Sequence, residues 1–161
     1  MADRLAVLHQ GIVQQIGTPR ELYMNPVNRF TASFLGDANM LDGELVRDDE
    51  KSWFFQTQIG EIAVRKISKS GHEESYQKAQ KYSLMFRPEN VLFEDNCSRE
   101  YPENHIRAEI LENSYWGESS FRTMQAGSFR FYANEFAAPE RPAGALEKII
   151  LPADRIIPLS C

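Results

Sequence analysis

Few residues of this sequence have the type and spacing that chemistry requires. The three histidines, His9, His72 and His105, are scattered and form no recognisable motif. Cys97 and Cys161 are far apart, unlike the closely spaced pairs of zinc sites. Phosphoryl transfer needs positioned phosphate contacts, yet the sequence has no G-x-x-x-x-G-K-[ST] loop to cradle phosphates. We therefore name no catalytic residue, no cofactor-binding residue, no cofactor and no metal ligand.

Five residues are candidates for interface or ligand contacts. Tyr115 and Trp116 precede a turn, where they either line a small-molecule pocket or pack into the core. Arg87 and Glu89 flank a proline, and they either bridge a domain or dimer interface or stabilise their own turn. Tyr132 lies in a stretch of alternating aromatic residues that cannot all face one core, which makes it a candidate contact with a second copy.

The elements that would position these residues begin with a hairpin and two short helices. Leu5–Leu8 and Ile12–Ile16 are short apolar runs around a glycine turn, which predicts two paired strands. Thr18, with proline next and glutamate three residues on, is a helix start that Asn25-Pro26 soon ends. Asn28 caps a second helix, which ends near Gly36. In this helix Phe30 and Phe34 share one face, so we expect them in the core.

From Asp42 onward the pattern predicts β-structure. Short stretches separated by turn residues, several with alternating polarity, favour a small barrel or sandwich. The expected strands are Gly43–Arg47, Trp53–Thr57, Glu61–Arg65, Tyr82–Arg87, Ile106–Tyr115, Ser120–Met124, Phe129–Ala133 and Lys148–Leu151.

One internal similarity runs through this β-region. Met85–Leu92 and Ile149–Ile156 both carry an apolar strand that meets a proline, then an acid or amide, and then apolar residues again. Proline ends a ladder of hydrogen bonds because it has no amide proton to donate. On the pattern alone, an internal repeat and two unrelated strand–turn elements both remain open.

Composition excludes several function classes. The net charge of −5 argues against nucleic acid as a partner, and glutamates interrupt the densest basic stretch, residues 65–81. No apolar run approaches the ~18 residues of a membrane span, and Met1–Arg4 does not open a signal peptide. We expect a cytoplasmic protein, in which a Cys97–Cys161 disulfide is disfavoured.

The opening segments resemble the end of the nucleotide-binding domain of ABC-importer ATPases. Ala2–Gly11 resembles the segment just after the switch-histidine helix of that family. Ile16–Tyr23, followed by Pro26, resembles the next characteristic segment of the same domain. Phe30–Asn39 resembles the helix and hinge that lead into the C-terminal domain. The resemblance implies that residues 1–38 are the C-terminal remnant of such a domain, in which Phe30 and Phe34, no longer covered by the rest of that domain, form an exposed apolar patch.

The rest of the chain resembles the TOBE domain, an OB-fold-like module of maltose, polyamine and ferric-iron importers. Phe86–Val91 looks like its "RPE" signature, and Leu151–Ile156 looks like its closing element. The resemblance implies a mainly β protein, with an OB-like barrel over residues 39–161 after the hairpin and helices. Gly36–Asn39 favours a ferric-iron or polyamine importer.

The resemblance implies a regulatory and dimerisation role in an importer's ATP-binding subunit. The implied partners are a second copy of the chain and the permease at the inner face of the plasma membrane. The LSGGQ-type signature, the magnesium-binding carboxylate and the switch histidine of the family are absent from the sequence. We therefore expect that the chain does not hydrolyse ATP. We interpret it as part of a truncated subunit. The alternative is a stand-alone TOBE protein whose barrel binds a small molecule or anion.

Overall fold

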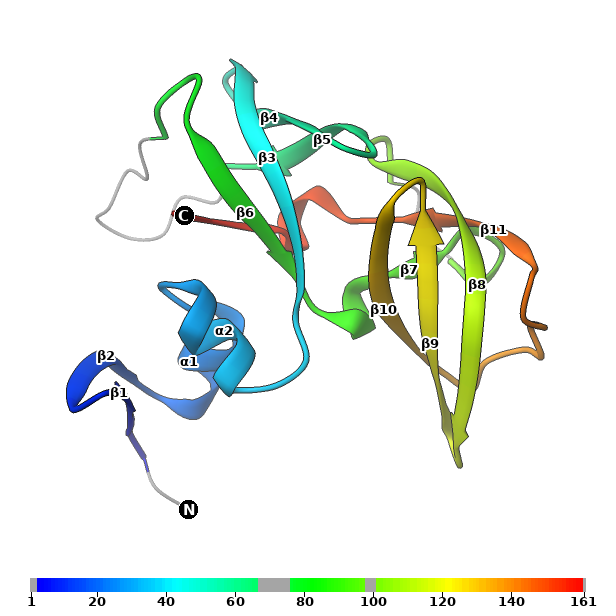
Figure 1. The fold of residues 1–161 in the computed structure, drawn as a ribbon, viewed down its shortest axis with the longest axis horizontal. Coiled ribbons are helices and arrows are strands. Elements are labelled where there is room, and N and C mark those ends of the chain that lie inside the picture. Colours follow the sequence, from blue (N-terminus) through cyan, green and yellow to red (C-terminus); the bar gives the residue numbers. More distant parts are fainter. Residues whose placement is uncertain (1–2, 67–75, 98–100, 161) are drawn as a thin grey trace.

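The N-terminal part of the protein is a hairpin followed by two helices. A computed structural model of the chain describes residues 3–66, 76–97 and 101–160 (Figure 1). Strands β1 (Leu5–His9) and β2 (Ile12–Gly17) pair only with each other, as an antiparallel two-stranded sheet. The turn between them places Gln10 and Gly11 at positive φ, which the glycine adopts at little cost. The expected hairpin is confirmed.

Both helices begin at the residues expected from the sequence. Helix α1 (Pro19–Met24) starts with a capping box, in which Thr18 Oγ1 accepts from the Glu21 amide and the Glu21 carboxylate accepts from the Thr18 amide. Helix α2 (Arg29–Phe34) starts at Asn28, whose side chain accepts from the amide three residues later. Local capping therefore fixes where each helix begins.

The buried face of α2 differs from the face that the spacing of its phenylalanines predicts. Thr31 and Ala32 are fully buried, whereas Phe34 is 64% exposed and stacks on Phe30 with ring centroids 5.7 Å apart. Ala32 packs against Met85 and Leu159 of the sheet below. A small residue lets the helix approach the sheet closely, so the phenylalanines lie on its outer side. Phe34 therefore lies outside the core and is exposed, as expected for a remnant that no catalytic domain covers.

The remaining strands form two antiparallel sheets of five strands each. The first sheet has the order β12-β6-β3-β4-β5, with β3 Asn39–Asp48, β4 Ser52–Thr57, β5 Gly60–Arg65, β6 Lys81–Phe86 and β12 Ile157–Ser160. The second has the order β7-β11-β8-β9-β10, with β7 Leu92–Phe93, β8 His105–Trp116, β9 Ser119–Ala126, β10 Phe129–Phe136 and β11 Leu146–Ile150. Three short 3-10 helices connect them, at η1 Pro88–Asn90, η2 Glu94–Asn96 and η3 Ala153–Arg155.

The two sheets are copies of one arrangement that exchange their last strands. Strands β3 to β6 correspond to β8 to β11, η1 corresponds to η3, and β7 corresponds to β12. After η1 the chain crosses to the second sheet, and after η3 it crosses back to the first (Figure 1). This topology favours the internal repeat over two unrelated elements.

The equivalent positions differ by one residue from those expected. Met85 of β6 pairs with Ile157 of β12. In the second copy, Ile150 of β11 pairs with Leu92 of β7. Met85 therefore corresponds to Ile150. Pro88 therefore corresponds to Ala153 and not to Pro152. Buried apolar residues and backbone pairing determine the register, and the prolines fall one position apart.

A pair of asparagines joins the two copies. Asn39 exchanges two hydrogen bonds of 2.7 and 2.8 Å with the backbone of Tyr132, on edge strand β10. Its counterpart Asn104 does the same with Ala63, on edge strand β5. Each side-chain amide imitates a peptide group, so it satisfies an edge that would otherwise remain open.

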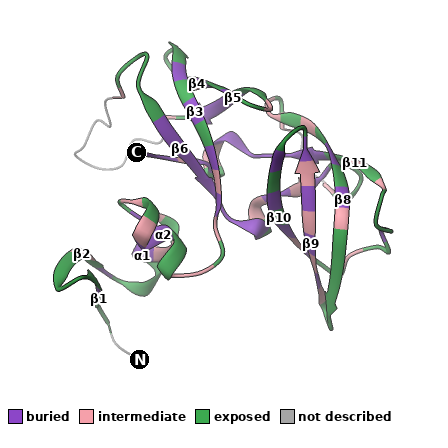
Figure 2. Cartoon of the chain, viewed as in Figure 1, coloured by how far each residue is buried: buried purple, intermediate pink, exposed green. Residues whose placement is uncertain are grey.

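Both sheets share one hydrophobic core (Figure 2). Leu41, Phe55 and Leu84 from the first sheet meet Ile110 and Met124 from the second, and all five are fully buried. The eight strands expected after Asp42 are all present, and the mainly β class is confirmed. Strands β7 and β12 were not expected, because they are too short for an alternating pattern to show.

Candidate functional site

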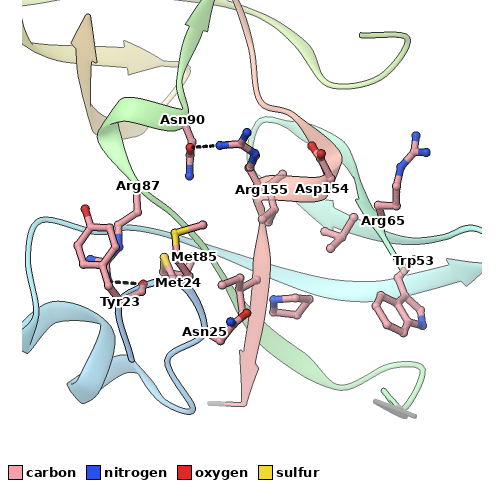
Figure 3. Close-up of a pocket in the computed structure, with 14 residues that line it drawn as sticks. Tyr23, Met24, Asn25, Trp53, Arg65, Met85, Arg87, Asn90, Asp154 and Arg155 are labelled. Atoms are coloured by element: carbon pink, nitrogen blue, oxygen red, sulfur yellow. Dashed lines mark hydrogen bonds between the residues drawn. The ribbon is translucent and has the colours of Figure 1, made fainter. Parts of the chain in front are cut away.

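Arg87 connects the two helices to the sheets through hydrogen bonds. It follows β6, its side chain is 98% buried, and its guanidinium donates to four backbone carbonyls. Three of these, on Ala32, Gly36 and Asp37, lie 2.9–3.1 Å from Nη1. The fourth, on Tyr23, lies 3.1 Å from Nη2 (Figure 3). The guanidinium also stacks over the Tyr23 ring at 4.0 Å. One side chain thus holds the ends of both helices and the segment that leads into β3.

Glu89 reaches the same helix. Its carboxylate accepts a 2.7 Å hydrogen bond from the Tyr23 hydroxyl. Burial, together with this bond to Glu89, raises the pKa of Tyr23 to about 12. Burial lowers the pKa of Arg87, but an arginine remains charged at neutral pH. Both candidates from the proline turn therefore contact helix α1, which is more than local turn stabilisation.

Tyr115 and Trp116 lie at the exposed end of the β8–β9 hairpin. They are 75% and 71% exposed, and successive strand residues face opposite sides of the sheet, so they do not converge on one pocket. Trp116 instead begins an aromatic stripe on the outer face of the second sheet. Phe121 stacks on Trp116 at 5.9 Å and on Tyr132 at 5.3 Å. Tyr132 is 44% exposed, as alternation along its strand predicts.

A buried ionic cluster at the second sheet was not anticipated. Arg122 is fully buried and donates to Glu135 at 2.9 Å. Arg141 bonds the same carboxylate as well as Asp95, at 2.7 Å, and Glu147, at 3.0 Å. The sequence held a signal, since Arg122 and Glu135 alternate with core residues and therefore occupy the inward face of their strands. Charges buried in this way must be paired, which gives the cluster a structural role.

Two features are absent from the described part of the chain. Residues 3–66, 76–97 and 101–160 contain no group of three or more His, Cys, Asp or Glu side chains arranged to hold a metal ion. In the same ranges no helix has the length and apolar character needed to cross a membrane. Cys161 and most of the basic stretch of residues 65–81 lie outside the described residues.

The sequence is similar to the ATP-binding subunits of polyamine importers. The spermidine/putrescine import ATP-binding protein PotA of Hahella chejuensis is 30% identical over 144 residues, which are 88% of this chain and 38% of the relative. Its namesake in Vibrio parahaemolyticus is 29% identical over 88% of this chain and 36% of the relative. The chain matches the C-terminal part of an ABC-importer ATP-binding subunit. It spans little more than a third of the length of these relatives.

A solved structure supports the fold of this C-terminal part. The cytoplasmic molybdate-binding protein ModG, with molybdate bound, has a TM-score of 0.61 to this chain at 10% identity. The match covers 86% of this chain and 100% of ModG. At this identity the likeness shows the fold alone, which is the OB-like TOBE fold expected from the sequence. No protein-family model matches the chain.

Proposed function

We propose that these residues form the regulatory and dimerisation part of the ATP-binding subunit of a polyamine importer. The similarity to spermidine/putrescine import subunits over 88% of the chain carries this proposal. The 161 residues contain no phosphate loop, so ATP hydrolysis belongs to other parts of such a subunit. We assign residues 1–38 to the end of the nucleotide-binding domain and residues 39–161 to the TOBE domain.

The Arg87 contacts suggest how regulation would act. A domain that regulates a neighbour must be attached to it firmly, because a loose tether transmits no change of orientation. Arg87 and Glu89 provide that attachment, since one turn of the β-domain holds Tyr23, Ala32 and the Gly36 segment together. A movement of helices α1 and α2 would therefore move the sheets, and a movement of the sheets would move the helices.

The aromatic stripe supports a homodimer. On one face of the second sheet, half-buried Phe121 stacks between the exposed rings of Trp116 and Tyr132, so the three form a continuous aromatic surface. A two-fold axis across such a face would bring the same patch together from both copies and bury it. In the assembled importer the pair would lie against the permease, at the inner face of the plasma membrane.

A domain exchange tests the proposal. The region of the Hahella chejuensis subunit that matches this chain is replaced by residues 1–161, and putrescine uptake and ATPase activity are measured in cells and in membranes. We expect uptake well above that of a subunit from which the region has been deleted. An exchange protein that hydrolyses ATP and yet imports no more than the deleted subunit would contradict the proposal. A second exchange with Arg87→Met should hydrolyse ATP but lose most of the restored uptake.

A further inference from the structure

A groove runs along β12, between the end of helix α1 and strands β4 and β5. It has a volume of about 300 Å³. Figure 3 shows Tyr23 and Arg87 at one end of it, Trp53 and Arg65 at the other, and Arg155 between them. This volume is at the lower end of the range for small-molecule sites, which is about 300–1,000 Å³.

The groove carries excess positive charge. Three arginines and a single carboxylate, that of Asp154, line it. Arg87 donates only to neutral carbonyls, and among the described residues its Nε has no hydrogen-bond partner. Arg155 donates to the neutral side chain of Asn90 at 3.2 Å. Among the described residues, Arg65 is the one groove arginine that forms an ion pair, at 3.1 Å with Glu103.

The walls of the groove are apolar. Trp53, Val64, Met85 and Ile156 line it, and each belongs to the buried part of the protein. A few charged groups above an apolar wall are the usual composition of a site for an organic molecule. An inorganic ion would leave this wall without a partner.

The internal repeat provides a comparison within the same chain. A second groove, of about 320 Å³, lies at the equivalent place along η1 and β7. Its described lining contains Glu89 and Glu135, and no arginine or lysine. The fold alone therefore does not make such a groove basic. The charge of the first groove is a property of its own side chains.

We propose that the first groove binds a small organic anion, with its carboxylate or phosphate at Arg155 and its apolar part against Trp53 and Met85. The bound anion would touch η3, strand β4 and strand β6, so it would stabilise their present arrangement. Ligand binding does not depend on the proposed role in an importer, and the test below uses the isolated chain.

Trp53 serves as the reporter for the test. The chain has two tryptophans, and Trp116→Phe leaves Trp53, in the groove, as the only one. Its fluorescence is followed during titration with phenyl phosphate and with hexanoate, and with inorganic phosphate and hexylamine as controls. We expect a saturable change with at least one of the organic anions. The anion that binds more tightly identifies the preferred head group.

Two variants make the test specific. Arg155→Gln should weaken the affinity about tenfold or more, the value of a hydrogen bond to a charged group. Arg130→Gln removes an arginine on the outer face of β10, outside the groove, and should leave the affinity unchanged. Saturation by neither organic anion would overturn the proposal. Equal binding of hexylamine or of inorganic phosphate, or an Arg155→Gln variant that binds like its parent, would also overturn it.

Discussion

Replacing Arg87 with methionine should release the helices from the sheets. The variant leaves four backbone carbonyls without their donor, in a place where solvent hardly reaches. A hydrogen bond to a charged group contributes about 1.5–3 kcal/mol, but bonds from one guanidinium do not add independently. A buried acceptor that loses its partner costs about 1–3 kcal/mol. We therefore expect a loss of roughly 3 kcal/mol from the attachment of the helices.

Amide hydrogen exchange measures this loss directly. The amides of Leu22, Asn25, Ala32 and Leu35 are hydrogen-bonded within the two helices. At about 1.4 kcal/mol for each factor of ten, their exchange should become roughly one hundred times faster. The strands should keep their protection, because the core they share does not include Arg87.

A second arginine provides the matched control. Arg29 also joins a helix to the first sheet, through a 3.2 Å ion pair with Asp42, but both side chains are about half exposed or more. Such a pair contributes less than about 1 kcal/mol, so Arg29→Met should speed helix exchange less than about fivefold. The reasoning is refuted if the Arg87 and Arg29 variants exchange alike, or if the strands lose protection together with the helices.

Four further outcomes are expected. Purified protein should neither bind nor hydrolyse Mg-ATP, and magnesium-dependent micromolar binding in calorimetry would contradict this. Light scattering should show a dimer that the double variant Trp116→Ser, Tyr132→Ser converts to monomer, whereas a parent that stays monomeric at high concentration would rule out the stripe as the contact. A hydrogen bond from Arg141 holds the pKa of Asp95 below its usual value. The Asp95 carboxylate therefore stabilises the fold above about pH 4, and its contribution is lost as the pH falls further. In acid denaturation, the Asp95→Asn variant should lose stability less steeply than the parent. Amides of the isolated two-stranded sheet, Leu5–Gly17, should exchange faster than those of the five-stranded sheets, and equal protection in a monomer would contradict this.

The elements that the sequence predicted are those set by neighbouring residues. Thr18 and Asn28 cap the helices through groups three residues away, so their role is visible without a tertiary structure. Alternation along β10 predicted the buried face of Phe129 and Phe131 and the outward Tyr132, because a strand reverses its side chains at every step. The resemblance in the N-terminal segments likewise needed only residues close together in the chain.

The contacts that form the candidate site are set by residues far apart in sequence. Arg87 meets Tyr23 and Ala32 only because the chain folds β6 beneath the helices, and no local pattern reveals which carbonyls its guanidinium will reach. Which face of α2 is buried depended on how closely Ala32 could approach the sheet, and this left Phe34 outside the core.

The exchange of β7 and β12 between the sheets belongs to the tertiary structure for the same reason. Strands of two and four residues are too short to show a period, and their partners are chosen by the edges that the two copies leave open. The groove along β12 follows from that exchange, since it is lined by residues from both ends of the chain. The sequence by itself determined the longer strands, the helix starts and the outward aromatic residues, because those depend on local sterics and hydrogen bonds. Only the folded chain decided which of these surfaces meet, because that depends on packing between segments whose separation in sequence carries no signal.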